Sequence, residues 1–352
     1  MQKGTEAPKR RRIWDWLLIG LVLICFGIAC YPYFRAPTPQ ILTEGTLELH
    51  FIDVGQGDAA LLCCNGHNML IDGGSSQSSS RIYTYLMKHN IKTRDYLVAT
   101  PPHDDHAGGL AGALNAAKAE RALSSASEAE GRAFQSFLKY LGQQGIALEV
   151  PQPGDTFDLG TAHITVLGPL RESKIENDTS LVLRVSFGDF HALITGDAEQ
   201  GEEADILASG AELKSDVLKV GHHGGSDATS RAWLDAVQPK TAVISCGRNN
   251  DYGHPSPQTL DRLQSAGAEI LRTDQQGDIV LIVQIDGSYA LANEMGVPEG
   301  EITYVVNTKS GKFHDPKCSS AAEITDQNRL DFTGTREELI ERGYEPCGRC
   351  KP

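Results

Sequence analysis

A short polar loop limits what this chain can fold into more than any other part of its sequence. Residues 100–109 read TPPHDDHAGG and directly follow a short apolar strand predicted over residues 96–100. Two imidazoles and two carboxylates within four residues direct several ligands into one small volume. This mixture suits zinc, manganese or iron, with open coordination positions filled by water. A solvated polar loop is the alternative interpretation, but two further clusters of the same kind favour a metal site.

Carboxylates also end two of the predicted strands. Asp197 follows an apolar strand at residues 191–195, and Asp72 ends the strand at residues 68–72. Each carboxylate is therefore expected at the mouth of its strand, where α/β proteins build their sites. Taken alone, each is equally well an ordinary turn at the end of a strand.

Three histidines follow later strands. His222 and His223 are adjacent and come after a strand predicted at residues 217–220, whereas His254 lies on a turn before a proline. Neighbouring side chains in an extended segment point in opposite directions. One of the pair is therefore expected to bind metal while the other supports a ligand or contacts substrate. His254, considered alone, favours a structural role.

The rest of the pattern is typical of an α/β protein. Apolar residues have helical spacing over residues 80–89, and Ser256 with Pro257 opens a helix that Gly267 closes. Further strands are predicted at residues 47–54, 59–63, 162–167, 180–187 and 241–245. This mixture predicts sheets covered by helices.

The N-terminus has the features of a membrane anchor. Residues 1–12 hold five cations, and residues 13–34 form an apolar run, with aromatic residues at both ends, that is long enough to span a bilayer. The cations place residues 1–12 in the cytoplasm and the rest of the chain outside it, so a single-pass protein of the cell membrane is expected. A cleaved signal peptide is the competing interpretation. Residues 35–45, with two prolines, are expected to form a stiff linker.

Charge is distributed unevenly along the chain, whose formal net charge is -14. Residues 1–12 carry +4, residues 303–352 are neutral, and residues 13–302 therefore carry -18. A body this acidic disfavours bulk electrostatic binding of nucleic acid. This charge does not exclude a nuclease that binds phosphate through metal ions.

Residues 303–352 contain a second set of metal ligands. His314 and Cys318 are followed, after 28 residues, by Cys347 and Cys350. Three thiols and one imidazole complete a tetrahedral zinc site with no open position, which indicates a structural zinc. A unit this small buries little apolar surface, so a metal staple is reasonable. Two disulfides are the alternative, weakened because the motif holds three cysteines.

Together these motifs resemble the metallo-β-lactamase fold, and within it the hydrolase domain of the ComEC-type competence proteins of DNA uptake. The matching stretches lie in family order between His50 and Leu263 and read HFIDVGQGDAALL, LIDGG, ATPPHDDHAGGL, NDTSLVLRVSFGDFHALITGDAE, LKVGHHGGSDATS and NNDYGHPSPQTLDRL. The resemblance implies an αββα sandwich over residues 46–295, with one or two zinc or manganese ions at one edge of the sheets. The C-terminal unit is similar to zinc-binding units appended to exported nucleases.

The resemblance also implies roles for matching residues. It places His103 at a first metal and Asp197 between the two metals. The ligands of the second metal would be Asp105, His106 and either His222 or His223. Asp58 and Asp72 match supporting positions, and His254 matches a supporting or substrate-contacting position. The family's first histidine falls on Pro101, which cannot bind metal, so a single-metal enzyme is a serious alternative.

The favoured function is that of a membrane-anchored, metal-dependent hydrolase, a phosphodiesterase or nuclease acting on DNA or nucleotides outside the cytoplasm. A metal-bound water, its pKa lowered to about 7, would attack the phosphoryl centre. Asp105 or Asp197 would orient this water, and His254 would stabilise the developing anion. Two alternatives remain: a binding module that keeps the fold without turnover, and an esterase or phosphodiesterase for cell-surface or small-molecule substrates. No protein partner is indicated.

Overall fold

The computed structural model describes residues 45–292 and 302–352, apart from 317, 326, 327 and 335. The expected membrane anchor at residues 13–34 lies outside the described residues, as does the linker at 35–45 except for its last residue. Within the described part of the chain, no helix is both long enough and apolar enough to cross a membrane.

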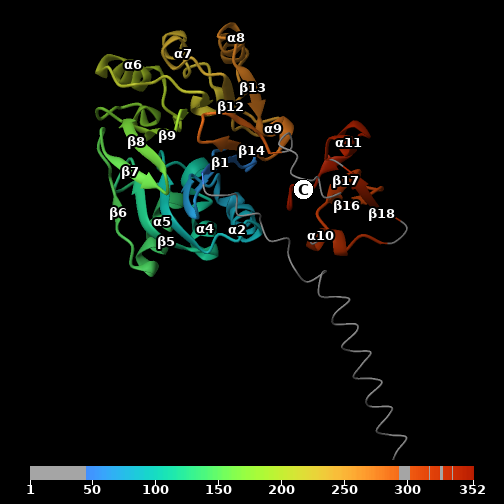
Figure 1. The fold of residues 1–352 in the computed structure, drawn as a ribbon. Coiled ribbons are helices and arrows are strands. Elements are labelled where there is room, and N and C mark those ends of the chain that lie inside the picture. The colour runs from blue at the N-terminus through green and yellow to red at the C-terminus, as the bar shows by residue number, and fades with distance from the viewer. Residues whose placement is uncertain (1–44, 293–301, 317, 326–327, 335) are drawn as a thin grey trace, which may run out of the picture. The chain divides into compact units, whose positions relative to one another are not determined.

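Two large sheets form the body of the molecule (Figure 1). The first has eight strands in the order β15-β14-β1-β2-β3-β4-β5-β6. Its strands are β1 (Thr46–Phe51), β2 (Ala60–Cys64), β3 (His67–Ile71), β4 (Thr93–Ala99), β5 (Lys118–Ser124), β6 (Leu148–Glu149), β14 (Ile279–Gln284) and β15 (Tyr289–Leu291). Neighbouring strands from β3 to β6 are parallel, and the other neighbours are antiparallel.

The second sheet has seven strands in the order β13-β12-β11-β10-β9-β8-β7. These are β7 (Thr156–Leu159), β8 (Ala162–Gly168), β9 (Val182–Phe187), β10 (Phe190–Ile194), β11 (Val217–Lys219), β12 (Thr241–Ile244) and β13 (Glu269–Arg272). Neighbours from β10 to β13 are parallel, and those from β7 to β10 are antiparallel. Each sheet therefore has one parallel half.

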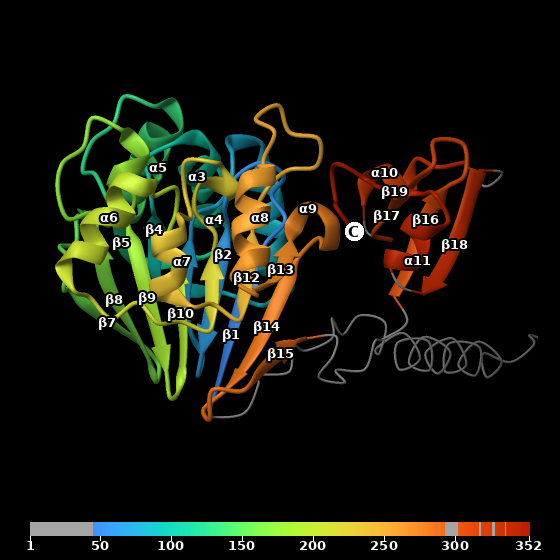
Figure 2. The same cartoon turned by 90° about the horizontal axis from the view of Figure 1, so that it is seen from above.

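Helices cover the outer faces of both sheets, so the body has four layers (Figure 2). The covering helices are α2 (Ser79–Lys88), α4 (Leu110–Ala116) and α5 (Arg132–Gln144) on the first sheet, and α6 (Gln200–Ser209), α7 (Arg231–Val237) and α8 (Pro257–Ser265) on the second. Apolar side chains between the sheets form one core, and those beneath each helical layer form two more. The predicted αββα sandwich is confirmed.

The covering helices follow from the spacing of their apolar residues. In α5, Phe134, Phe137 and Leu141 recur at helical spacing, and all three are buried against the first sheet. Helix α8 begins as the sequence predicts, because the Ser256 hydroxyl accepts a hydrogen bond from the first turn and Pro257 is the first helical residue.

The parallel strands bring the polar loops of the sequence to one edge. Asp72 follows β3, residues 100–106 follow β4, Asp197 follows β10, His223 follows β11, and His254 follows β12. Because parallel strands of a sheet end at the same edge, side chains far apart in the sequence meet there.

Residues 302–352 form a separate small sheet with strand order β18-β16-β17-β19. Its elements are β16 (Ile302–Asn307), β17 (Lys312–His314), α10 (Ser319–Ala322), β18 (Arg329–Gly334), α11 (Arg336–Glu341) and β19 (Glu345–Pro346). Its main apolar cluster has four buried members: Tyr304, Val306, Phe313 and Leu339. A core this small needs an additional stabilising element, such as a bound metal ion.

Two glycines allow the loop after β3 to pack directly against the start of α4. A β-carbon on Gly109 would lie 1.8 Å from the carbonyl oxygen of Gly73, and one on Gly73 would lie 2.9 Å from the backbone of Gly109. The Gly73 N–H also donates to the carbonyl of His106 at 2.7 Å. This close backbone contact fixes the Asp72 loop relative to the helical turn that carries His106.

We expect Gly109→Ala to lower the free energy of unfolding by about 1–3 kcal/mol or more, because the new methyl group has to displace backbone. Gly142→Ala is the matched control, because an added β-carbon there meets nothing within 4 Å inside α5. That variant should be more stable by about 0.5–1 kcal/mol. Chemical denaturation measures both, and equal effects of the two substitutions would contradict the role given to this backbone contact.

Candidate metal centre

Four side chains from three elements meet at the shared edge of the two sheets. They are Asp105 and His106 of the short helix α3 (Asp104–Ala107), Asp197 after β10, and His223 in the 3-10 turn η3 (Gly221–Gly224). One ligand atom from each residue lies within 4.8 Å of the other three. Two imidazoles and two carboxylates at this spacing provide four ligands for one divalent ion.

Asp197 lies between the two imidazoles. Its Oδ2 is 2.9 Å from Nε2 of His106, and its Oδ1 is 3.4 Å from Nε2 of His223. Asp105 approaches from the open side, with Oδ2 3.3 Å from the same His223 nitrogen. The two Nε2 atoms therefore share one carboxylate and face one another across the cluster.

The opposite nitrogen of each imidazole is held by a fixed partner. Nδ1 of His106 lies 2.9 Å from Oδ2 of Asp72, whose carboxylate accepts hydrogen bonds from the backbone N–H and the hydroxyl of Thr100. Nδ1 of His223 donates to the carbonyl of Ser245 at 3.0 Å. With the proton on each Nδ1, the lone pair of each Nε2 points into the cluster, as in metal-binding histidines.

Three buried atoms at the centre lack a hydrogen-bond partner: Nε2 of His106, Nε2 of His223 and Oδ1 of Asp197. Buried polar atoms without partners are costly, and each requires an explanation. A divalent ion would satisfy all three at once, so these residues fit a metal.

The carboxylates also increase the affinity of the imidazoles for protons. Burial opposes the charged form of His223, but Asp197 and Asp58 outweigh it and raise its pKa to about 10. The pKa of His106 is raised well above its usual range against the same effect of burial, with Asp197 again contributing most. The pKa of Asp105 is lowered to about 2, although burial alone would raise it. Protons and a metal ion therefore compete for the same atoms.

His103 is not part of this cluster. Its Nε2 lies 3.2 Å from Oε2 of the exposed Glu176, and its ring centroid is 6.5 Å from that of His106. Among the described residues, no group of three or more mutually close ligands contains His103. Together with Pro101, this leaves the first metal position of the family without histidine ligands close to Asp197.

His222 and His223 face different neighbours, but not because the segment is extended. Both have left-handed backbone conformations, with φ of 48° and 52°, so the expected extended geometry is wrong. Such conformations cost about 1 kcal/mol or more per residue and are typical of functional sites. The turn directs His223 into the cluster, whereas Nδ1 of His222 lies 3.0 Å from the exposed Asp227.

His254 lies beside the cluster rather than in it. Its ring centroid is 5.2 Å from that of His222 and 6.5 Å from that of His223. Burial, and then the positive charge of these two imidazoles, lowers the pKa of His254. Its Nδ1 is buried and has no hydrogen-bond partner among the described residues. A neutral imidazole in this position is available to contact a substrate.

We did not expect a role for Lys219 from the sequence. This lysine in β11 is 2% exposed, and its Nζ lies 2.5 Å from Oδ2 of Asp58. Asp58, in turn, lies 3.1 Å from Nδ1 of His223. The available signal was a lysine within a short apolar strand, because lysine is almost never fully buried unless it is paired. The ion pair positions Asp58 behind a candidate ligand.

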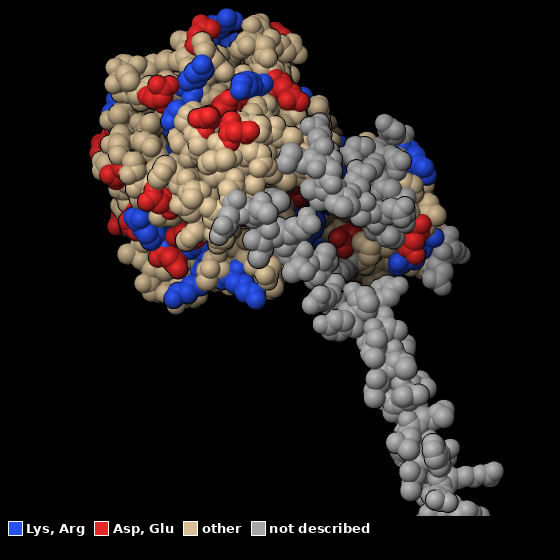
Figure 3. Space-filling view, in the orientation of Figure 1, with Lys and Arg blue, Asp and Glu red and all other residues tan. Residues whose placement is uncertain are grey.

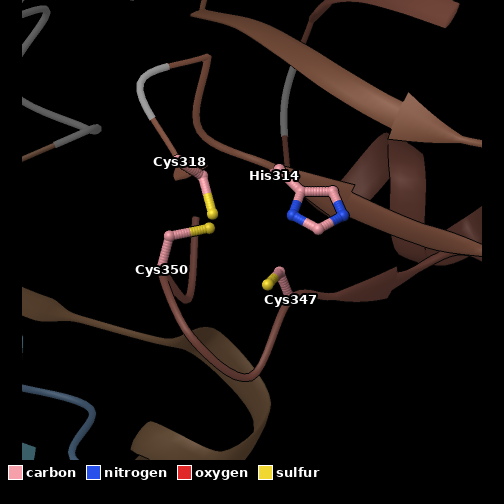
Figure 4. A group of neighbouring side chains, drawn as sticks. All are labelled: His314, Cys318, Cys347 and Cys350. Carbon is pink, nitrogen blue, oxygen red and sulfur yellow. The ribbon is translucent and has the colours of Figure 1, made fainter. Parts of the chain in front are cut away.

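The small C-terminal sheet holds the second group of ligands. His314, Cys318, Cys347 and Cys350 each place one ligand atom within 4.8 Å of the others, and their side chains converge in Figure 4. The three cysteines are free thiols, and Nδ1 of His314 is buried without a hydrogen-bond partner. Three sulfurs and one nitrogen in this arrangement fit a closed tetrahedral zinc site.

The chain belongs to the metallo-β-lactamase superfamily. The family profile described as "Metallo-beta-lactamase superfamily" matches residues 52–248. This range contains the whole candidate metal centre and excludes the C-terminal ligand group.

Within the superfamily, the relatives belong to the ComEC-type branch of competence proteins. ComE operon protein 3 of Bacillus subtilis is 31% identical over 73% of this chain and 36% of its own length. Recombination protein 2 of Haemophilus influenzae is 29% identical over 74% of this chain and 31% of its own length. Competence protein ComA of Neisseria gonorrhoeae is 28% identical over 73% of this chain and 35% of its own length. The chain spans about a third of the length of these curated relatives.

Two solved structures align with about two thirds of this chain. The metallo-beta-lactamase fold protein YhfI from Bacillus subtilis is 14% identical, with a TM-score of 0.47, over 68% of this chain and 99% of YhfI. A metallo hydrolase named Igni18, from Ignicoccus hospitalis, is 16% identical with a TM-score of 0.46, over 67% of this chain and 98% of Igni18.

We expect Lys219→Met to destabilise the protein by about 3–5 kcal/mol, because it leaves the buried Asp58 carboxylate without its cation. The double variant Lys219→Met/Asp58→Asn removes both charges and should recover much of that loss. Denaturation of the wild type, both single variants and the double variant gives the coupling energy. Additive effects would show that the pair does not position Asp58.

Metal binding should strengthen as pH rises. The pKa of His223 in the folded protein, about 10, lies above its ordinary value of 6.5. Protonation of His223 therefore stabilises metal-free protein fully below pH 6.5, and this contribution is lost as pH rises through 10. A divalent ion takes the place of the protons, so the increase in Tm on adding zinc or manganese should grow across this range. An increase that is largest at the acidic end would contradict this competition.

Proposed function

We propose that this protein is a membrane-anchored phosphodiesterase that acts outside the cytoplasm through one divalent ion at the candidate metal centre. The observation that carries the proposal is the convergence of two unsatisfied imidazole nitrogens and two carboxylates at the shared edge of the sheets. The membrane anchor is supported by the apolar run at residues 13–34 and the cations before it.

The negative charge of the centre favours binding of an anionic substrate only when a metal ion is present. Asp58, Asp72, Asp105 and Asp197 surround the cluster, and Lys219 is the buried cation beside them. On the described surface visible in Figure 3, Lys and Arg are scattered among Asp and Glu rather than gathered into a broad basic face. A phosphodiester would therefore approach through the ion rather than through a basic surface.

The burial of each ligand suggests its part in the reaction. A divalent ion held here supplies Lewis-acid chemistry, lowering the pKa of water and polarising a phosphoryl oxygen. The Asp105 side chain is 33% exposed, so it can accept a proton from an attacking water, whereas Asp197 is 4% exposed and holds both imidazoles in place. Neutral His254, whose ring centroid lies 6.5 Å from that of His223, can donate a hydrogen bond to the developing anion.

The names of the relatives support DNA or nucleotides as the substrate. They are described as competence, recombination and ComE operon proteins. The C-terminal unit supports the same assignment, because we propose that it carries a structural zinc like the units appended to exported nucleases. Zinc or manganese at the centre and zinc in the C-terminal unit then account for both ligand groups.

The proposal is tested by measuring the metal content and the rate of phosphodiester hydrolysis of the purified full-length chain. We expect about two metals per chain in the wild type, one at each ligand group. Asp197→Ala and His106→Ala should each lose one metal and reduce turnover of bis(p-nitrophenyl) phosphate about 100-fold or more. Cys347→Ser should lose the other metal. His163→Ala is the control, because this exposed histidine of β8 lies outside both groups.

Several outcomes would contradict the proposal. Unchanged turnover and metal content in Asp197→Ala would show that the centre is elsewhere. A metal-loaded centre with no turnover of phosphodiesters would favour a binding module. Hydrolysis of p-nitrophenyl acetate without hydrolysis of phosphodiesters would favour an esterase.

A further inference from the structure

A groove of about 580 Å³ connects the candidate metal centre with the loop that holds two of the zinc ligands. Asp105 of the metal cluster lines this groove, together with Gln56 and Tyr252. From the C-terminal unit, Arg349 of the Cys347–Cys350 loop and Lys351, the residue after Cys350, also line it. The groove is therefore bounded partly by the hydrolase body and partly by the C-terminal unit.

The two C-terminal cations differ in how they are held. Nζ of Lys351 lies 3.5 Å from Oδ1 of Asp53, and a β-carbon on Gly55 would lie 3.3 Å from the same Nζ. Lys351 therefore anchors this end of the chain on the loop that also carries Asp58. Arg349 is exposed, and its guanidinium donates to the neutral hydroxyl of Ser319 at 2.8 Å. Its positive charge is available to an anion in the groove.

Tyr252 supplies an exposed aromatic ring on the same groove. It is 70% exposed, the highest value among the exposed large hydrophobic side chains of the described residues. Its backbone is nevertheless fixed, because the side-chain oxygen of Asn250 accepts hydrogen bonds from the N–H groups of Tyr252 and His254. The Tyr252 and His254 ring centroids are 5.9 Å apart, and His254 lies next to His222. Aromatic rings thus lead from the groove to the metal centre.

We infer that Tyr252 and Arg349 form a binding rim for single-stranded nucleic acid, with Arg349 contacting a backbone phosphate and Tyr252 stacking on a base. The inference rests on the proposed phosphodiesterase function and adds a role for the zinc unit in recognising the substrate. A cation and an exposed aromatic ring on one groove are the combination by which proteins bind single strands without reading their sequence. A single strand fits better than a duplex, because an unpaired base is needed to stack on Tyr252.

This arrangement also reconciles the acidic body with a nucleic-acid substrate. The body carries -18, so its bulk field disfavours a polyanion. The C-terminal unit is neutral overall but places Arg349 on the groove that leads to Asp105. The structural zinc would fix the loop between Cys347 and Cys350, and so fix the position of this charge.

The test compares binding and turnover in matched variants of the full-length chain. Binding of a dye-labelled 12-nucleotide phosphorothioate single strand, which resists cleavage, is measured by fluorescence anisotropy with the metal ligands intact. We expect Arg349→Gln to raise Kd about fivefold and to reduce the salt dependence by about 0.7–1 in slope. Tyr252→Ala should raise Kd at least about fivefold. Lys309→Gln, in a turn of the same unit, and Tyr83→Ala, on α2, are the controls and should change Kd little.

Turnover separates this inference from the proposed function. In otherwise wild-type chain, Arg349→Gln should raise KM for the oligonucleotide about fivefold. It should leave hydrolysis of bis(p-nitrophenyl) phosphate within about twofold, because that molecule has a single phosphate, which the metal centre would bind, and no second phosphate for Arg349. Equal effects of Arg349→Gln and Lys309→Gln, or tighter binding of duplex than of single strand, would overturn the inference. Oligonucleotide binding that depends on the rim, with no turnover of either substrate, would instead contradict the proposed function alone.

Discussion

The concentration of buried negative charge where the two sheets end is the constraint on which the rest of this site depends. Three of the surrounding carboxylates, those of Asp58, Asp72 and Asp197, are almost fully buried. Lys219 compensates for one of them. Each remaining carboxylate either orients an imidazole or leaves an oxygen directed into the cluster, and charge left uncompensated in this way is costly in a protein interior. Without a metal, protonated His106 and His223 compensate this charge, and a divalent cation bound here would take their place.

Much of this centre could be predicted from the sequence, for a physical reason. A residue that closely follows a parallel strand is placed by the strand itself, so Asp72 and Asp197 meet wherever the sheets form correctly. The loop after β4 then brings His106 of α3 to them. The fold was predictable on the same basis, because apolar periodicity marks long strands and Ser256 with Pro257 marks a helix start. Short elements are harder to recognise, because β6 has only two residues and the alternation of β7 extends over only four.

The remaining features depend on tertiary contacts that leave no local pattern. Both histidines adopt the same left-handed conformation, so the residue type does not reveal whether His222 or His223 enters the cluster. His103 instead contacts Glu176 of the 3-10 turn η2 (Glu176–Thr179), 73 residues away in the sequence. Lys219 looks like an ordinary charged residue until its strand is known to be buried on both faces.

The two ligand groups differ in chemical softness, so they are expected to differ in the metals they bind and in their sensitivity to oxidants. Thiolates of Cys318, Cys347 and Cys350 favour soft or borderline ions, whereas imidazole and carboxylate also accept harder ones such as manganese. The thiols are also open to oxidation, to which the body's ligands are inert. Under the role proposed for Arg349, oxidation of these thiols would disturb the loop that bears it and weaken binding of a long substrate, while the imidazole and carboxylate ligands of the body stayed intact.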